Sequence, residues 1–324
     1  MTQTPPTERP LVTFALFAYN QEDYIREAIE GAFAQTYEPL EIILSDDCSS
    51  DRTFEIMQEM AAAYEGPHEV LLNRNESNLG LARHINALLE KSKGTLFSWN
   101  AGDDIALPDK MHELANPLMH DTEVTGSHSS VIEIDLKGTE VGRRIRTLDE
   151  QGLTLDDVIE KCASVVSQSH MFRKSAVWRF GKFEENLSNE GPPTTFRQLL
   201  NGGRIIYIEK PLTLYRVGSG VSTYSGRDIR MLKISEPQKV ISWRLSSYRQ
   251  MIIDVSRLDP RSPMITPLKR KVSLYENLAK INRNEEPLVS LLRNFQIEPT
   301  SMASLRAFVR VQCPEFIFRR LSAR

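Results

Sequence analysis

Two neighbouring aspartates, Asp103 and Asp104, are the side chains whose type and spacing first suggest chemistry. They follow a short apolar run that contains Leu96 and Phe97, and a turn at residues 107–109 comes after them. We interpret the run as a buried strand that ends in a polar loop. Ligands of open α/β sheets bind beyond the carboxyl ends of the strands, so this loop is a candidate site. Adjacent carboxylates that cannot both be buried cheaply favour a divalent cation or ligand hydroxyls as partners.

The dipeptide by itself also fits a simpler interpretation. A solvated Asp-Asp turn could cap the helix that we expect to begin near Pro108. The choice between the two depends on the elements that surround the loop.

Strands and helices alternate through the first hundred residues. Apolar runs predict the strands, and apolar residues at helical spacing predict the helices. We expect strands at 11–18, 40–44, 70–72 and from 96 onward, and helices at 25–33, 54–64 and 81–89. This order predicts a mostly parallel sheet with right-handed crossovers.

Three of these four strands end in polar residues. Asn20 follows the first strand, Asp46 and Asp47 follow the second, and Asp103 and Asp104 follow the fourth. Parallel strands place their carboxyl ends on one edge of the sheet. This convergence favours a ligand site over a capping turn.

Two common nucleotide-binding motifs are missing. The turn after the first strand, residues 18–21, has no glycine that would let a pyrophosphate approach the backbone. No P-loop occurs in the sequence, and neither does the Gly-rich, Lys-bearing loop expected of a nucleotidyltransferase. A nucleotide bound here must be held by side-chain carboxylates, with or without a metal.

Composition is that of an ordinary globular protein. The chain has 324 residues, of which 40% are hydrophobic and 26% charged, and this length allows one large domain or two smaller ones. A net charge of -3 gives no reason to expect nucleic-acid binding. No apolar stretch is long enough to span a bilayer, and the polar residues 1–10 predict a flexible N-terminus and no signal peptide. The widely spaced cysteines, Cys48, Cys162 and Cys313, fit a reducing cytoplasm.

Taken together, the motifs resemble those of the family 2 glycosyltransferases, which have the GT-A fold. The resemblance covers the chain from about Leu11 to about Ser222. It implies the inverting transfer of a sugar from a nucleotide-diphosphate donor to an acceptor hydroxyl. The motifs that carry it are YN at 19–20, SDDCSSD at 45–51, NLG at 78–80, GDD at 102–104 and LPD at 107–109.

The resemblance also implies a set of donor-binding residues. Backbone around Phe17 should lie against the nucleotide, and one of Asp46 and Asp47 should bond to the base. Arg83 should sit near the diphosphate or brace the metal loop. Asp103 should be the last Asp of the D-x-D motif, which holds Mg²⁺ or Mn²⁺. The full implied set is Phe17, Tyr19, Asn20, Asp46, Asp47, Arg83, Asp103 and Arg216.

The sequence departs from the family pattern in three places. Ala101 stands where the first Asp of D-x-D is expected, although one Asp with donor oxygens and water can suffice for Mg²⁺. Gly191 stands where the family has its general base, and Glu190 is the nearest carboxylate. Glu190 equally fits an acid placed at a helix start by the dipole. Gly218 replaces a frequent histidine, and Arg216 beside it could meet a phosphate or lie on the surface.

The second half is less regular. We expect strands at 126–135, 165–172, 205–208 and 212–217, a helix at 149–162 and a helix after Glu190. His170 reads as a packed core histidine, because no second ligand lies at metal spacing. The family pattern fades after residue 222, where one long helix or two at 229–258 and a further helix at 267–282 are expected.

The resulting hypothesis is an α/β protein of GT-A type with a C-terminal helical extension. We predict a transferase domain at 11–222, with a nucleotide half at 11–104 and an acceptor half at 105–222, followed by the extension at 223–324. Glu190 is the expected base, a UDP-sugar the expected donor, and a glycan or lipid-linked glycan the acceptor.

Two questions stay open at this stage. A non-catalytic sugar-nucleotide-binding or scaffolding protein on the same fold is the alternative, because the residues at 101 and 191 are not acidic. The basic, aromatic tail at 304–324 suits docking of a cytoplasmic protein at the inner membrane face, but it equally suits packing on the body or on a second subunit.

Overall fold

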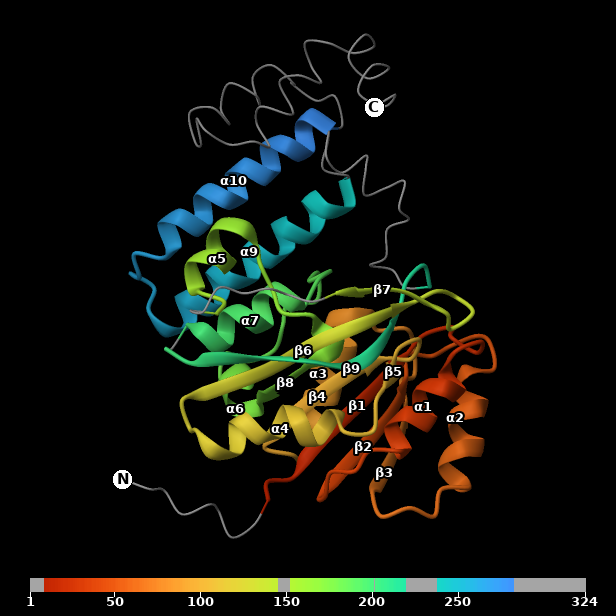
Figure 1. Ribbon diagram of the computed structural model, residues 1–324. Coiled ribbons are helices and arrows are strands. Elements are labelled where there is room, and N and C mark those ends of the chain that lie inside the picture. Colours follow the sequence, from red (N-terminus) through yellow and green to blue (C-terminus); the bar gives the residue numbers. More distant parts are fainter. Residues whose placement is uncertain (1–8, 145–151, 201, 220–237, 283–324) are drawn as a thin grey trace. The chain divides into compact units, whose positions relative to one another are not determined.

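The computed structural model describes residues 9–144, 152–200, 202–219 and 238–282. The chain divides into two units, residues 1–186 with 190–223 and residues 187–189 with 224–324. The first unit holds all of the described strands, and the second holds the long helices α9 and α10 (Figure 1).

The alternating order predicted for the first hundred residues is confirmed. Strands β1, β2 and β3 end within two residues of their predicted ends, and no end was predicted for β4. The elements are β1 Val12–Ala18, α1 Ile25–Phe33, β2 Leu40–Asp46, α2 Thr53–Ala62, β3 Glu69–Arg74, α3 Leu81–Lys91 and β4 Leu96–Ala101.

The second half of the unit is built from longer strands and short helices. Its elements are β5 Ile105–Ala106, α4 Lys110–His120, β6 Val124–Ile134, β7 Glu140–Arg144, α5 Leu155–Lys161, the single 3₁₀ turn η1 Ser167–Ser169, β8 His170–Arg173, α6 Lys174–Trp178, α7 Gly191–Leu199 and β9 Arg204–Arg216.

Three expectations for this half were wrong in detail. Residues 167–169 form a 3₁₀ turn, so the strand predicted at 165–172 is only β8. The strands predicted at 205–208 and 212–217 are one strand, β9, whose pairing with β6 shifts register before Pro211. A proline has no N–H for the ladder, and the sheet absorbs it as an irregularity. The helix predicted at 149–162 begins only at Leu155, because Thr154 and Asp157 form a capping box.

The strands form one mixed sheet in the order β3-β2-β1-β4-β8-β6-β9-β5, with β7 paired to β6. Strands β3, β2, β1 and β4 are parallel, and β8 runs antiparallel to β4. The four parallel strands therefore present their carboxyl ends on one edge, as the sequence predicted, with β1 in the centre of this half.

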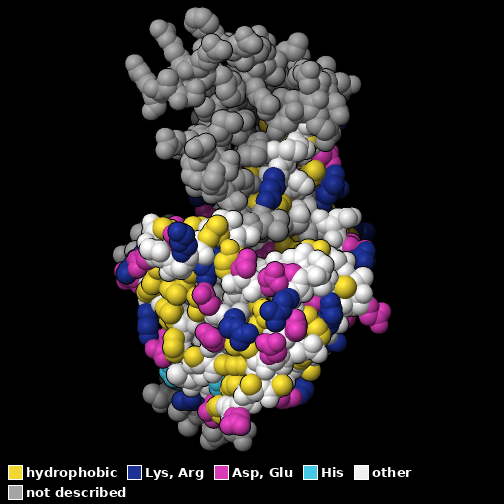
Figure 2. All heavy atoms as spheres, turned by 90° about the vertical axis from the view of Figure 1, so that its right-hand side faces the viewer, with side chains coloured by type: hydrophobic (Ala, Val, Ile, Leu, Met, Phe, Trp, Pro, Cys, Tyr) yellow, Lys and Arg dark blue, Asp and Glu magenta, His cyan; other side chains and the backbone are white. Residues whose placement is uncertain are grey.

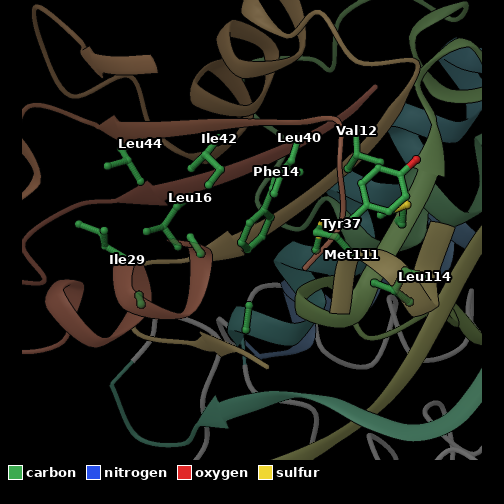
Figure 3. Close-up of a cluster of buried hydrophobic side chains, with 14 of the residues drawn as sticks. Val12, Phe14, Leu16, Ile29, Tyr37, Leu40, Ile42, Leu44, Met111 and Leu114 are labelled. Carbon is green, nitrogen blue, oxygen red and sulfur yellow. The ribbon is translucent and has the colours of Figure 1, made fainter. Parts of the chain in front are cut away.

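One face of the parallel half carries the main hydrophobic core. Alternate residues of β1, among them Phe14 and Leu16, point to this face and are fully buried. They pack with Ile42 of β2, with Ile29 of α1 and with Met111 of α4 (Figure 3). Burial of each large apolar side chain contributes about 1.5–3 kcal/mol, so this cluster fixes α1 and α4 on the sheet.

The opposite face carries aromatic contacts. Trp99 of β4 meets Phe97 and Phe172 edge-on, with ring centroids 5.8 and 5.2 Å apart. Phe17 of β1 contacts His84 of α3 in the same way at 5.9 Å. Helix α3 therefore covers this face, and the sheet has helices on both sides (Figure 1).

The outer surface of α1 and α2 is highly charged. Figure 2 shows Lys and Arg side chains interspersed with Asp and Glu side chains on the face that includes these helices. Arg26 of α1 pairs with Glu59 of α2, and Arg52 pairs with Glu55 one turn later. These pairs are exposed, and such pairs add little to stability.

The second unit contains α9 (Gln238–Leu258) and α10 (Ile265–Asn282). The break predicted at residues 259–263 is confirmed, while the part of the first helix predicted at 229–237 lies outside the described residues. The basic tail at 304–324 also lies outside them. None of the helices among the described residues combines the length and apolar character that a bilayer crossing needs.

His170, predicted to be a core histidine, is 1% exposed, and its Nε2 lies 3.2 Å from Gln198 Oε1. Burial, with a smaller effect from the Lys110 charge, lowers the pKa of His170 to about 4. An unfolded chain restores the ordinary pKa of about 6.5, so between pH 6.5 and pH 4 the unfolded state binds the extra proton.

We therefore expect acid to weaken the fold through His170. The free energy of unfolding should fall by about 2–3 kcal/mol more in the parent than in His170→Gln between pH 7.5 and pH 4.5. Urea titrations at the two pH values measure this difference, and His112→Gln, at an exposed position in α4, is the control. Equal losses in the parent and His170→Gln would show that His170 does not carry the effect.

Candidate active site

The carboxyl end of β1 holds two acidic loops, one on each side. The carbonyl of Ala18 accepts a hydrogen bond of 2.9 Å from the backbone N–H of Asp47, in the loop after β2. The carbonyl of Phe17 accepts one of 2.9 Å from Gly102, in the loop after β4. The loops that carry Asp47 and Asp103 therefore flank the end of one strand, at the edge where the sequence predicted a site.

Gly102 is required for the second of these contacts. A Cβ atom at this position would lie 2.8 Å from Ala18 Cβ, 2.8 Å from Ile25 Cδ1 and 2.7 Å from Gln21 Oε1. The loop packs so closely on β1 and α1 that only a residue without a side chain fits. Gly102 thereby fixes the distance between the Asp103 loop and the central strand.

Asp47 is fully engaged by the protein. Its carboxylate accepts hydrogen bonds from Asn75 Nδ2 and from the backbone N–H groups of Leu79 and Gly80, all between 2.8 and 2.9 Å. Gly80 has a positive φ of 74° at the start of α3, and the Asp47 bond holds this turn. Asp47 therefore shapes the loop that leads into α3.

Asp46 has spare acceptor capacity. Its Oδ2 accepts from the N–H of Ser49 at 3.0 Å and lies 3.3 Å from Arg74 Nε. Its Oδ1 is buried and has no hydrogen-bond partner among the described residues. Of the two adjacent acids, Asp46 thus has the oxygen that is left unsatisfied.

The turn after β1 is tied to the loop after β2. The N–H of Asn20 donates to Ser49 Oγ at 2.8 Å, and Asn20 Oδ1 accepts from the N–H of Ser50 at 2.9 Å. Asn20 adopts a positive φ of 52°, which asparagine tolerates better than most residues. Tyr19 beside it is 48% exposed, whereas Phe17 is half-buried against His84. The Tyr19 ring is therefore available to a ligand at this edge.

The Asp103–Asp104 pair is held by β9. Asp104 Oδ1 accepts a 2.9 Å bond from the backbone N–H of Arg216, and Asp103 Oδ2 accepts a 2.7 Å bond from Ser219 Oγ. Burial and the neighbouring Asp103 charge raise the pKa of Asp104 well above its usual range. Both acids are buried, Asp104 at 1% exposure and Asp103 at 4%, but Asp103 keeps one carboxylate oxygen for which the described residues provide no hydrogen bond.

Arg216 is a buried brace. Its guanidinium donates from Nε to the Asp103 carbonyl at 3.1 Å, from Nη1 to the Asp135 carbonyl at 3.0 Å and from Nη2 to Glu27 Oε2 at 2.7 Å. It also lies over the ring of Tyr24, 4.7 Å from the centroid. Arg216 thus ties the Asp103 loop to α1 and to the turn between β6 and β7.

Arg83 and Glu190 occupy different settings. Arg83 forms a half-exposed ion pair with Glu185. Glu190 is 9% exposed at the N-terminus of α7, and the Ser167 side chain hydrogen-bonds to it. Burial raises the pKa of Glu190. Glu190 is thus a buried carboxyl group at the start of a helix, whereas Arg83 is paired at the surface.

Gly191, which stands where the family pattern has its general base, is closely surrounded. A Cβ atom there would lie 3.1 Å from Ser167 Oγ and 3.2 Å from Ser164 Oγ. Two serine hydroxyls therefore stand where the side chain of an aspartate would begin.

Comparison with known families matches residues 13–181, more than half of the chain, to "Glycosyl transferase family 2". The chain belongs to this family.

Curated relatives match over part of their length. This family 2 chain is 28% identical over 181 residues to an uncharacterized glycosyltransferase of Haemophilus influenzae, which is 55% of the chain and 54% of that protein. It is 37% identical over 109 residues to an uncharacterized glycosyltransferase of Rickettsia prowazekii, 34% of the chain and 32% of that protein. The chain thus spans about a third to a half of the length of these relatives.

Solved structures share the fold of this family 2 member. Staphylococcus aureus TarS, residues 1–349 in complex with UDP, superposes with a TM-score of 0.58 at 17% identity, covering 89% of this chain and 81% of TarS. The mannosyltransferase PcManGT of Pyrobaculum calidifontis, in complex with GDP-Man and Mn²⁺, gives 0.54 at 18% identity, covering 98% and 80%. These similarities confirm the GT-A fold.

Sequence reasoning missed three residues of this glycosyltransferase site. Lys110, Ser167 and Ser219 each contact a site loop or a site acid. Ser219 stands next to the motif residue Gly218 and could have been found there. Lys110 and Ser167 belong to no motif, and nothing in their spacing marks them.

We expect Gly102→Ala to weaken both the fold and the site, because the added methyl group forces the Asp103 loop away from β1. The free energy of unfolding should fall by about 1–3 kcal/mol. Thermal and urea unfolding measure the change, and Gly142→Ala is the matched control, because its methyl group would meet only the side-chain oxygen of Glu133 at 3.3 Å. If Gly102→Ala were as stable as the parent, the loop would have room for a methyl group, and the close packing around Gly102 would not constrain it.

Proposed function

We propose that this chain is an inverting glycosyltransferase that moves a sugar from a nucleotide-diphosphate donor to a hydroxyl of a glycan or lipid-linked glycan. The observation that carries the proposal is the pair of acidic loops, 46–47 and 102–104, on either side of the end of β1 in a family 2 chain. Neighbouring structures that contain UDP, UDP-GlcNAc or GDP-Man support a nucleotide sugar as the donor. The expected donor is a UDP-sugar carrying a hexose or an N-acetylhexosamine.

The nucleotide would lie along the edge formed by the ends of β1 and β2. Tyr19 offers an exposed ring beside Asn20, and Asp46 has the unsatisfied carboxylate oxygen. Asp47 would act indirectly, because its own bonds hold the loop before α3. Arg216 would brace the Asp103 loop, since its donors already meet protein oxygens.

A divalent cation fits the site only if the protein and the donor diphosphate coordinate it together. The described residues contain no group of three or more His, Cys, Asp or Glu side chains that could hold a metal by themselves. Asp103 can offer one carboxylate oxygen, and Mg²⁺ commonly takes one or two carboxylates together with phosphate oxygens and water. Asp103 would therefore hold Mg²⁺ or Mn²⁺ against the donor diphosphate. When bound, the cation neutralises charge that develops on the leaving diphosphate.

Glu190 would take the acceptor proton. In a single displacement the acceptor oxygen bonds to the anomeric carbon, the bond from that carbon to the diphosphate breaks, and the hydroxyl proton passes to the Glu190 carboxylate. Burial raises the pKa of Glu190, and a general base works best when its pKa lies near the working pH. The Ser167 hydroxyl beside it restricts the orientation of the carboxyl group.

A second candidate function is nucleotide-sugar binding without transfer. Gly191 favours it, because a glycine stands where the family's usual base is expected and the Ser164 and Ser167 hydroxyls crowd that position. Binding and turnover measurements on the same protein separate the two candidates.

Asp103→Ala and Asp103→Asn should abolish the gain in nucleotide affinity that a metal provides. Calorimetric titration with UDP and GDP, with and without Mn²⁺, measures it, and we expect at least a tenfold loss in the presence of Mn²⁺ and little change in its absence. Asp156→Asn, at an exposed position in α5, is the control. Metal-dependent binding that persists in both Asp103 variants would remove Asp103 from the cation site.

Glu190→Gln should lower donor turnover by about 10²- to 10⁴-fold while UDP affinity stays the same, because the amide cannot accept the proton. Gly191→Asp should not raise turnover, because its side chain meets Ser164 and Ser167. Release of UDP from UDP-sugars in single-turnover assays measures both. An active Glu190→Gln variant would show that a different group is the base, and a large gain in Gly191→Asp would show that the parent lacks its base, which favours the binding protein.

A further inference from the structure

The ammonium group of Lys110 is fully buried at the start of α4. Its Nζ donates to Asn100 Oδ1 and, at 2.5 Å, to the carbonyl of Gln168. The same nitrogen lies 5.2 Å from the centroid of the Phe14 ring. All of these partners are neutral, so the lysine is held by hydrogen bonds and not by a salt bridge to any described carboxylate.

One hydrogen-bonded partner lies next to the expected metal-binding loop, and the other lies next to the expected base. Asn100 stands three residues before Asp103, and its Nδ2 donates to the carbonyl of Asp104 at 3.5 Å. Gln168 is the middle residue of η1, which begins with Ser167, the hydroxyl partner of Glu190. Lys110 therefore links the loop of the metal-side aspartate to the turn that contacts the expected base.

The η1 turn also forms hydrogen bonds with β9 and β6. It is therefore a firm anchor for the link through Lys110. The Gln168 carbonyl also accepts a 3.0 Å bond from Thr213 Oγ1 of β9, and Ser169 Oγ donates to the Ser129 carbonyl at 2.7 Å. The distance between Asn100 and Gln168 therefore determines how far the Asp103 loop lies from Glu190.

Burying an ammonium without a close counter-ion is costly. The cost shows in Lys110 itself, because burial lowers its pKa to about 7, against a partly offsetting attraction to Asp104. A methionine would fill the same space without that cost. The position therefore calls for a role that only a donor of several hydrogen bonds can perform.

We propose that Lys110 is a positioning residue whose buried ammonium holds the Asp103 loop and the Ser167 turn at a fixed separation, so that leaving group and acceptor proton are aligned for transfer. The proposal deepens the glycosyltransferase function and rests on it. It assigns Lys110 no contact with donor or acceptor.

Lys110→Met is the test, and Lys174→Met is the matched control, because Lys174 Nζ likewise donates to a backbone carbonyl, that of Ser92, at 2.6 Å. We expect Lys110→Met to lower kcat for UDP release at least 30-fold, with the donor KM and the UDP dissociation constant within threefold of the parent. Hydrogen exchange should rise in peptides covering 98–106 and 164–170 together. Lys174→Met should leave all of these values unchanged.

A kcat within threefold of the parent would overturn the proposal, and so would equal losses in kcat and UDP affinity, which indicate a general structural defect. If the parent neither binds UDP nor releases it, the proposed function fails. Hydrogen exchange then still tests whether Lys110 links the two segments, and unchanged protection of either peptide in Lys110→Met would refute that link. If Lys110→Met does not fold, Lys110→Gln, which keeps an N–H donor, is measured in the same way.

Discussion

The last two carbonyl groups of β1 each accept a hydrogen bond from the loop of a neighbouring strand, Ala18 from Asp47 and Phe17 from Gly102. A strand that ends inside a sheet must satisfy these carbonyls, because an unpaired buried backbone group costs free energy. Here the loops that satisfy them also carry the acids of the site. The requirement to pair two backbone oxygens therefore brings the loop of Asp46 and Asp47 and the loop of Asp103 to either side of one strand end.

The second layer of the site consists of buried polar groups that hold these loops. Asp47 fixes the turn before α3, Arg216 fixes the Asp103 loop against α1, and Lys110 joins that loop to the turn beside Glu190. Each of these groups is buried. Asp47 and Lys110 bond to neutral backbone or side-chain partners, and Arg216 bonds to two backbone carbonyls and to the carboxylate of Glu27. Such arrangements specify geometry strongly, because removal of either partner leaves a buried polar group unsatisfied. The Tyr19 ring is exposed, and one oxygen of Asp103 accepts no hydrogen bond from the part of the chain that the structure describes.

The departures from the family pattern have physical consequences in the structure. The Ser164 and Ser167 hydroxyls lie 3.2 and 3.1 Å from where a Cβ atom at Gly191 would stand, and the adjacent carboxyl group is that of the buried Glu190. Gly218 is followed by Ser219, whose hydroxyl reaches Asp103. A serine stands next to each of these two glycines, Ser167 beside Gly191 in space and Ser219 after Gly218 in the sequence.

The sequence by itself determined the order of strands and helices in the first half, the edge on which the acids meet, and the core position of His170. These follow from periodicity and from the rule that parallel strands end together, both of which are local or topological. The sequence did not determine that 204–216 is one strand, that Asp47 and Arg216 are consumed by internal bonds, or that Lys110 lies between two site loops. The bonds of Asp47 with Leu79, of Lys110 with Gln168 and of Arg216 with Glu27 join residues 32, 58 and 189 positions apart. Only the packed structure decides which of them form, because each depends on which polar groups burial leaves without water.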